Sequence, residues 1–266
     1  MSNKFKNDSL GTRMKENYEN RSKIFLPRRT YIILRVDGKA FHTYTRGLLR
    51  PFDQGLVEDM DATAIYLCKN IMGAQFAYVQ SDEISILLTD FDTNETQSWF
   101  DNNVQKLASV SASMATSAFN KARISRFMAT TTAVPLEDAV DKLTWAEFDS
   151  RAFQIPQKVE VENYFIWRQQ DATRNAISSA AQSVYSHKEL EGKSGDEKQE
   201  MMFQRGINFN DYDPKYKRGR LIVTETFPSI SVTSGDMAIR TKWVSTAAPI
   251  FTQDRDDLSD RIPESR

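Results

Sequence analysis

The pattern of apolar and polar positions between residues 30 and 134 predicts short strands separated by amphipathic helices. The apolar, β-branched run Thr30–Asp37 stops at an Asp-Gly pair, which is typical of a buried strand ended by a turn. Asp53 can then cap a helix that reaches about Asn70, because apolar residues recur on one face of that stretch. The other expected elements are strands at Gln75–Gln80 and Ile84–Thr89 around a Ser81-Asp82-Glu83 hairpin, a helix from Thr96 to about Ala122, and a strand at Phe127–Val134.

This order of strand, helix, strand, strand, helix, strand indicates an α+β protein with the ferredoxin-like βαββαβ fold. In that topology the first and third strands lie side by side and antiparallel at the centre of the sheet. The end of the first strand is then next to the beginning of the third. We therefore expect Asp37 to meet Asp82 and Glu83 at one edge of the sheet.

Beyond Pro135 the patterns predict additional C-terminal helices and strands, a mobile charged loop at Glu191–Glu200, and a polar tail, Thr252–Arg266, that frays. Helices are expected at Leu136–Asp141, Val159–Tyr185 and Gln199–Arg205, strands at Arg151–Ile155, Leu221–Thr226 and Arg240–Ser245, and a basic turn at Asp211–Arg220. The chain divides on this basis into an N-terminal sheet domain with the carboxylates (1–135), an extension integrated with it (136–251) and the tail (252–266).

Composition and charge limit the function without deciding it. The chain has 266 residues, is 40% hydrophobic and 27% charged, and carries a formal net charge of −1. Any nucleic acid must therefore be bound by local basic patches rather than by an overall positive field. Cys68 is the single cysteine, which excludes an intrachain disulfide. The polar N-terminus and the lack of a long apolar run predict a cytoplasmic protein with no membrane partner.

Two carboxylates that converge at a sheet edge suit phosphoryl or nucleotidyl transfer assisted by a divalent metal. Mg²⁺ prefers oxygen ligands and keeps several waters, so one or two aspartates plus substrate phosphates suffice to bind it. Gly38, directly after Asp37, allows metal or phosphate to approach closely. The alternative interpretation is that Asp37-Gly38 is only a turn and that Ser81-Asp82-Glu83 is a polar hairpin tip.

Candidate cations for a triphosphate or an RNA backbone come from several segments. Lys215, Lys217, Arg218 and Arg220, interleaved with Tyr212 and Tyr216, could contact RNA or form a solvated turn. His42 is one of two histidines, too few for a histidine metal cage, and either a structural or a nucleotide-contacting role is open to it. Further candidates are Arg46, Arg50, Arg151 and Lys198. The motifs of P-loops, dinucleotide folds, zinc proteases and serine hydrolases are absent.

Several motifs taken together resemble the tRNA-histidine guanylyltransferase family and its 3′-to-5′ polymerase-like relatives, most of all the bacterial and archaeal type. The resemblance covers about residues 4–222 and implies a polymerase-type palm that works in the reverse direction. A nucleotide, ATP or GTP, would activate the 5′ end of a tRNA, and the 3′-hydroxyl of an incoming nucleoside triphosphate would then attack the activated phosphate. The motifs are RVDGKAFH (Arg35–His42), LLRPFD (Leu48–Asp53), QSDEIS (Gln80–Ser85), IWRQQD (Ile166–Asp171) and INFNDYDPKYKRG (Ile207–Gly219).

The resemblance also implies roles for individual residues, and a homotetramer. Asp37, Asp82 and the Gly38 carbonyl would bind two Mg²⁺ ions, and Glu83 would be required for catalysis. Arg50 stands where the family has a triphosphate-contacting lysine, and Asp53 matches an aspartate near the nucleotide. The rest of the nucleotide site would be Asp37, Gly38, Lys39, Ala40, Phe41, His42, Ser81 and Asp82, and the tRNA or phosphate contacts would be Arg151, Asn175, Lys198, Lys215 and Arg218.

One departure from the family pattern bears on the substrate. Histidine-specific members carry H-I-N-N after W-R-Q-x-D-C, and that His helps to read the tRNA-His anticodon. This chain has WRQQDATRNA, with Thr173 in the His position. The departure favours the broader branch of the family, which restores 5′-truncated tRNAs by templated addition. The alternatives are guanylyl addition to tRNA-His alone, an RRM-like RNA-binding module, and a nucleotide cyclase with the same palm.

Overall fold

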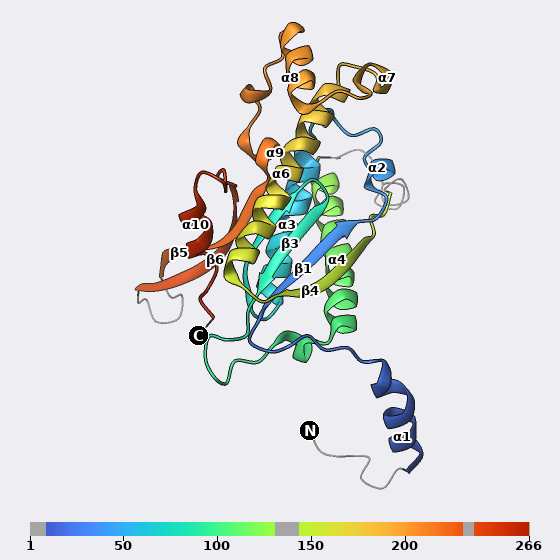
Figure 1. The fold of residues 1–266 in the computed structure, drawn as a ribbon, viewed down its shortest axis with the longest axis vertical. Helices are drawn as coiled ribbons and strands as arrows, with labels where there is room; N and C mark the ends of the chain where they lie inside the picture. The colour runs from blue at the N-terminus through green and yellow to red at the C-terminus, as the bar shows by residue number, and fades with distance from the viewer. Residues whose placement is uncertain (1–8, 131–143, 231–236, 266) are drawn as a thin grey trace.

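The centre of the protein is a six-stranded antiparallel sheet with strand order β4-β1-β3-β2-β5-β6, in a computed structural model that describes residues 9–130, 144–230 and 237–265 (Figure 1). The first four strands in this order form the ferredoxin-like sheet, so the α+β prediction is confirmed. The strands are β1 (Tyr31–Gly38), β2 (Ala74–Gln80), β3 (Glu83–Leu88), β4 (Phe148–Ile155), β5 (Arg220–Ile230) and β6 (Met237–Ala247).

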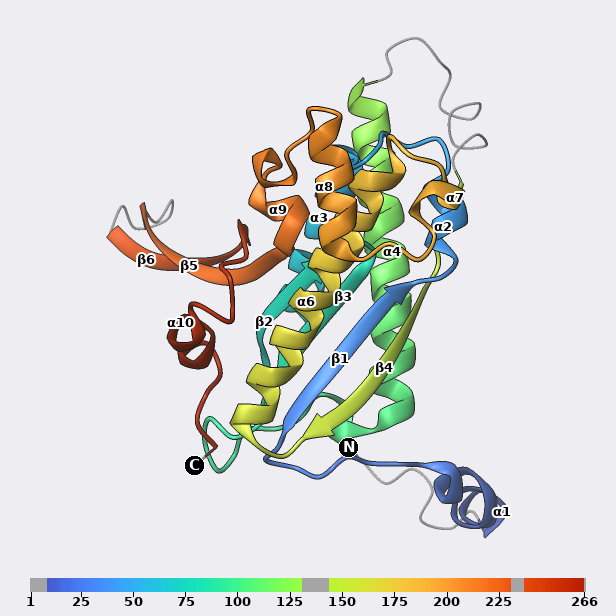
Figure 2. The same cartoon turned by 45° about the horizontal axis from the view of Figure 1, so that its top comes forward.

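Helices cover both faces of this sheet (Figures 1 and 2). The long helices α3 (Gln54–Asn70) and α4 (Val104–Thr130) pack on one face, and α6 (Lys158–Gln182) crosses the other. None of the helices in the described part of the chain combines the length and hydrophobicity needed to cross a membrane. The short helices are α1 (Ser9–Met14), α2 (Phe41–Tyr44), α7 (His187–Leu190), α8 (Gly195–Gln204), α9 (Pro214–Arg218) and α10 (Arg255–Asp260), with single turns at Lys15–Glu19, Asn20–Ser22, Trp99–Asn102 and Phe209–Asp211.

The strand β1 runs through the middle of the core, which explains why its sequence is almost continuously apolar. Ile32 and Leu34 point into the cluster between the sheet and α3 and α4, whereas Tyr31 and Ile33 point into the cluster under α6. Both faces of a central strand are buried here, so alternation with polar residues is not required. The same burial removes the exposed aromatic face that an RRM-like module uses to stack bases, because α6 covers it.

The predicted elements around the hairpin and the first long helix are confirmed. The turn at Ser81-Asp82 joins β2 to β3, and β1 pairs with β3 in antiparallel register. The α3 helix begins where its predicted cap places it, since Asp53 Oδ1 accepts a hydrogen bond from the Leu56 N–H at 2.8 Å.

The helix predicted from Thr96 starts instead at Val104, so this boundary was wrong. Phe100, Asp101 and Asn102 adopt left-handed backbone angles that no helix can contain. The side chain of Asn103 then accepts a hydrogen bond from the Lys106 N–H at 3.0 Å and starts the helix. A local turn, not the Ala/Ser-rich composition, sets the beginning of α4.

The strand predicted at Phe127–Val134 is also wrong, because residues 127 to 130 continue α4. Just before this segment, the guanidinium groups of Arg123 and Arg126 lie 3.8 and 2.5 Å from Asp59 Oδ2 of α3. These ion pairs hold α4 against α3. Residues 131–134 and the predicted helix at Leu136–Asp141 lie outside the described residues. The outer strand of the ferredoxin-like sheet is β4, which pairs with β1 along its whole length and begins earlier than the predicted Arg151.

The C-terminal third is more ordered than the sequence suggested. Most of the predicted mobile loop at 191–200 belongs to α8, which starts at a capping box between Ser194 and Glu197. The predicted basic turn contains the helix α9. The tail does not fray: Leu258 and Ile262 are fully buried against the cluster under α6.

Candidate active site

Asp37, Asp82 and Glu83 meet at one edge of the sheet, as the strand order predicted. The register of β1 and β3 places Asp37 opposite Glu83, and the Gly38 N–H donates to the Asp82 carbonyl at 3.1 Å. Asp82 lies in the two-residue turn between β2 and β3, in which Ser81 has a left-handed φ of 47°. Acidic side chains from two distant segments therefore share one location.

Burial makes the charged forms of both aspartates unfavourable. The pKa of Asp82 is raised to about 6, first by desolvation and then by repulsion from Asp37, against a hydrogen bond from Ser81 that lowers it. Desolvation also raises the pKa of Asp37, and Asp149, opposite it on β4, adds to the effect. Within the described part of the chain neither Asp37 nor Asp82 forms a salt bridge. Two partly desolvated carboxylates with no salt-bridge partner among the described residues favour a bound cation.

These donors fit Mg²⁺, whose preferred ligands are carboxylate and carbonyl oxygens. Asp37 and Asp82 supply the carboxylates, and the carbonyl of Gly38 follows directly in the chain. No group of three or more histidine, cysteine, aspartate or glutamate side chains within the described ranges is arranged to hold a metal ion. Water and substrate phosphates would have to complete the coordination, as they commonly do for Mg²⁺.

Replacing Asp82 by asparagine is expected to stabilise the metal-free protein at pH 8. A carboxyl group whose pKa is raised in the folded state destabilises the fold above that pKa and has no effect below its unfolded value. The difference between 3.8 and about 6 corresponds to roughly 3 kcal/mol as an upper limit. Urea unfolding in EDTA should show a gain of about 1–3 kcal/mol at pH 8 that vanishes near pH 4. Equal stability of variant and wild type across this range would contradict the raised pKa.

The loop after β1 presents unused backbone donors. Ala40 has a left-handed φ of 53°, and no group in the described part of the chain accepts a hydrogen bond from the N–H of Ala40, Phe41 or His42. Successive free N–H groups around a left-handed residue form a concavity that binds anions. The Phe41 ring is buried among Tyr44, Phe119 and Phe148, so only its backbone can serve a ligand.

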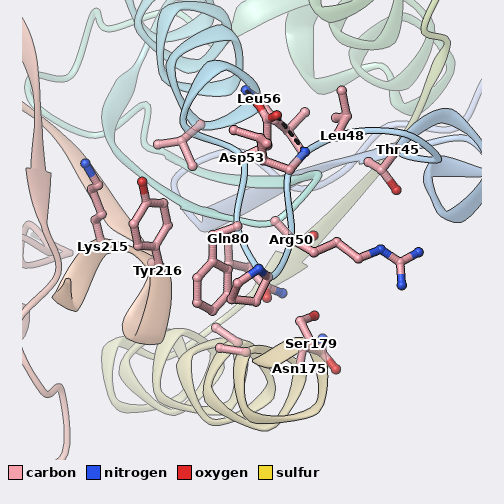
Figure 3. A pocket seen from close by; sticks show the side chains of 18 of the residues that line it. Thr45, Leu48, Arg50, Asp53, Leu56, Gln80, Asn175, Ser179, Lys215 and Tyr216 are labelled. Atoms are coloured by element: carbon pink, nitrogen blue, oxygen red, sulfur yellow. Dashed lines mark hydrogen bonds between the residues drawn. The ribbon is translucent and has the colours of Figure 1, made fainter. Parts of the chain in front are cut away.

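A cavity of about 380 Å³ adjoins this loop and the Ser81 turn, within the range of small-molecule sites. Figure 3 shows Asp53 and Leu56 from the start of α3, Asn175 and Ser179 from α6, and Lys215 and Tyr216 from α9 around it. Six of the predicted site residues line it: His42, Arg50, Asp53, Ser81, Asn175 and Lys215.

The walls of the cavity offer both stacking and hydrogen-bonding groups. Phe52 and Tyr216 are stacked, with ring centroids 4.8 Å apart and planes 3° from parallel. Gln80 and Arg220 also line the cavity, and each has a buried polar atom, Oε1 and Nη2, that no group in the described segments hydrogen-bonds. Buried polar atoms are costly when unpaired, so a ligand able to pair with them gains affinity.

The remaining predicted residues do not line this cavity. Lys39 pairs with Glu147 at 2.5 Å on the surface, and Arg151 lies 3.8 Å from Asp149. The Lys198 ammonium donates to the Ser178 hydroxyl at 3.2 Å. Arg218 lines a separate cavity of about 500 Å³ on α6 and α9, away from Lys215. The basic residues at 215–220 therefore line two different cavities and do not form one continuous surface.

Sequence reasoning missed two charged residues next to the aspartates. Asp149 of β4 lies directly opposite Asp37 of β1 in the sheet. The alternating pattern of residues 148–155 is the signal that identifies this segment as the outer strand and so places Asp149 there. Arg168 of α6 forms a two-point ion pair with Glu83. Nothing in the local sequence indicates that Arg168 is the partner of Glu83, because the two residues are 85 positions apart in the chain and meet only when α6 packs on the sheet.

Comparisons with known proteins identify one family. Residues 11–156 match the family model described as tRNAHis guanylyltransferase. A solved bacterial tRNA(His) guanylyltransferase (Thg1)-like protein in complex with ATP is 43% identical, with a TM-score of 0.82 and coverage of 96% of this chain and 99% of that chain. The corresponding complex with GTP is 42% identical with a TM-score of 0.75, covering 96% and 99%. The probable tRNA(His) guanylyltransferase of Dictyostelium discoideum is 25% identical over 86% of this chain and 90% of its own length.

Proposed function

The chain belongs to the tRNA(His) guanylyltransferase family, nucleotidyltransferases that act on the tRNA 5′ end, and from this premise we propose that it is a metal-dependent repair enzyme for 5′-truncated tRNAs. It adds nucleotides in the 3′-to-5′ direction, directed by base pairing with the opposite strand of the acceptor stem. The main observation in support of this proposal is that Asp37 and Asp82 converge beside free backbone donors and a nucleotide-sized cavity.

Each part of the site has a task in this reaction. Asp37, Asp82 and the Gly38 carbonyl would hold Mg²⁺, which would supply neutralisation of the triphosphate charge and activation of the attacking hydroxyl. The N–H groups of the loop at 40–42 and Arg50 receive the triphosphate. The cavity holds the base against Phe52 and Tyr216. These residues bring the 3′-hydroxyl to the activated 5′ phosphate, where a new P–O bond forms as the activating nucleotide leaves.

ATP and GTP are both proposed as substrates. The related bacterial structures were solved with each of these nucleotides. A purine ring has the flat face that the Phe52–Tyr216 wall can stack against. The donor of Arg220 and the acceptor of Gln80 match the mixed donors and acceptors of a purine edge.

Broad substrate choice is supported by the position of Thr173. This residue stands where histidine-specific relatives have a histidine, and its hydroxyl donates to the Gln169 carbonyl of its own helix at 3.1 Å. A hydroxyl engaged with its helix and set on a short side chain cannot replace an imidazole ring that reaches a tRNA base. We therefore propose that this chain belongs to the repair branch. A cytoplasmic homotetramer is proposed separately, from the family resemblance and the polar N-terminus.

The test is incubation with 5′-labelled tRNAs of several identities, each lacking its first nucleotide, with Mg²⁺, ATP to activate the 5′ phosphate, and one further nucleoside triphosphate at a time. The expected result is extension of every tRNA by the nucleotide complementary to the opposite base of the acceptor stem. Changing that opposite base should change the nucleotide incorporated, with a preference of tenfold or more for the match.

Other outcomes would assign other functions. Extension confined to tRNA-His would make the chain a guanylyltransferase of that tRNA alone. Cyclic product from ATP or GTP without tRNA would indicate a cyclase. Binding of tRNA without incorporation of any nucleotide, with Mg²⁺ or Mn²⁺ present, would refute the catalytic proposal and favour an RNA-binding module.

A further inference from the structure

Glu83 lies beside Asp82 but its carboxylate is fully engaged elsewhere. Arg168 of α6 donates from Nε to Oε1 at 2.8 Å and from Nη2 to Oε2 at 2.6 Å. The two side chains are only 8% and 9% exposed. A two-point charge-assisted contact fixes the orientation of both groups as well as their distance. Glu83 is therefore a poor candidate for a metal ligand or a mobile base.

The pair is the centre of a connected network. Ser85 donates from its hydroxyl to Glu83 Oε1 at 3.2 Å and lies 2.8 Å from the Tyr164 hydroxyl. On the other side, Arg168 Nη2 donates to Asp171 Oδ2 at 3.0 Å. Asp171 in turn accepts from the Asn175 side chain at 3.4 Å, and Asn175 lines the nucleotide cavity. The network thus links the turn that carries Asp82 to one wall of the cavity.

This arrangement is more than is needed for stability. A buried ion pair loses solvation, and well-packed apolar residues of similar size often stabilise a fold as well or better. What the pair supplies is a defined geometry between two elements, since its buried polar atoms all have partners. Geometry is critical here, because a displacement of about 1 Å at a reacting centre can cost a hundredfold in rate.

We propose that Arg168 is a positioning residue for nucleotide addition and that Glu83 acts through it. Arg168 holds the Glu83 carboxylate away from the metal site and fixes the Ser81-Asp82 turn relative to the α6 wall of the cavity. The inference rests on the proposed function for its activity readout. It goes beyond that function by giving Glu83 a structural partner and a role other than contact with substrate or metal.

The test is a double-mutant cycle of Arg168→Met, Glu83→Gln and the two combined, with Arg168→Lys as the conservative variant. We expect each single change to lower kcat by about a hundredfold and to change KM for the nucleotide less than about threefold. The double variant should be no slower than the worse single variant, because the two residues act as one unit. Lysine keeps the charge but not the two-point contact, so kcat should recover only in part.

A second measurement separates positioning from folding and does not depend on turnover. Hydrogen exchange of the amides at 80–84 should become faster in Arg168→Met, while the strands β1 and β4 keep their protection. The double variant, which has no unpaired buried charge, should regain thermal stability without regaining kcat. The matched control is Arg261→Met, which removes the arginine of an i,i+4 pair on α10 at 2.8 Å and should leave kcat and exchange at 80–84 unchanged.

Three outcomes would overturn the inference. Full activity in Arg168→Met with a dead Glu83→Gln would mean that Glu83 acts directly. Additive losses in the double variant would mean independent roles, and recovery of kcat along with stability would mean a purely structural pair. A wild-type protein that adds no nucleotide would defeat the proposed function instead, and the exchange measurement would still decide whether Arg168 fixes the turn.

Discussion

Asparagine in place of Asp37 or Asp82 is expected to slow nucleotide addition by about a thousandfold or more. In the proposed function each carboxylate supplies charge to a site for a divalent cation beside a triphosphate, and such a cation contributes several kcal/mol to transition-state stabilisation. About 4 kcal/mol corresponds to a factor of a thousand in rate. Single-turnover assays with labelled truncated tRNA and saturating nucleotide measure the effect directly.

The same variants should bind tRNA within about threefold of wild type. Affinity for RNA comes mostly from distributed contacts between basic groups and phosphates, which these changes leave intact. A filter-binding assay in the same buffer checks this, with Asp257→Asn on α10 as the control for loss of one surface carboxylate. Turnover within tenfold of wild type in either Asp37→Asn or Asp82→Asn would refute the site assignment.

Ending the chain at Thr252 is expected to destabilise the protein by about 4 kcal/mol or more. The segment removed contributes two fully buried apolar side chains, Leu258 and Ile262, and truncating one such side chain to alanine typically costs 2–5 kcal/mol. It also removes the Pro263 carbonyl, which accepts from the Tyr31 hydroxyl at 2.7 Å, and Glu264, which pairs with Lys158 at 2.6 Å. Urea unfolding followed by circular dichroism measures the loss.

Point variants test whether the loss of stability in the truncated chain comes from the buried side chains of the tail. Leu258→Ala alone should account for roughly half of the effect, whereas Leu10→Ala, on the exposed face of α1, should change stability by less than about 0.5 kcal/mol. An unchanged unfolding midpoint in the truncated chain would show that the tail is dispensable for the fold, contrary to its burial.

The predictable part of the fold is the part specified by neighbours in the chain. The apolar run at 30–37, the cap at Asp53 and the turn at 81–82 each depend on residues a few positions apart, and each formed as expected. The adjacency of β1 and β3 then followed from topology alone, and it brings Asp37 to Asp82.

Two of the errors come from competition between local preference and distant partners. The β-branched and aromatic residues from Phe127 onward favoured a strand, yet Arg123 and Arg126, just before them on α4, pair with Asp59 of α3 and hold this part of the helix against its neighbour. The tail looked disordered by composition, but its two large apolar residues fit the cluster under α6. The charged loop at 191–200 is a different case, because α8 begins at a capping box between Ser194 and Glu197, a local pattern that predicts a helix start.

The active site shows the same division between neighbours and distant partners. Residue types and their order along the chain suffice for the fold class and for the meeting of Asp37, Asp82 and Glu83, since these follow from periodicity, turn chemistry and topology. The partners of the buried charges follow only from packing: Arg168 reaches Glu83, and Asp149 reaches Asp37, across contacts that join residues far apart in the chain. Whether a charged side chain is buried depends on how the whole chain packs. A local sequence pattern therefore does not predict which opposite or like charge will lie beside it.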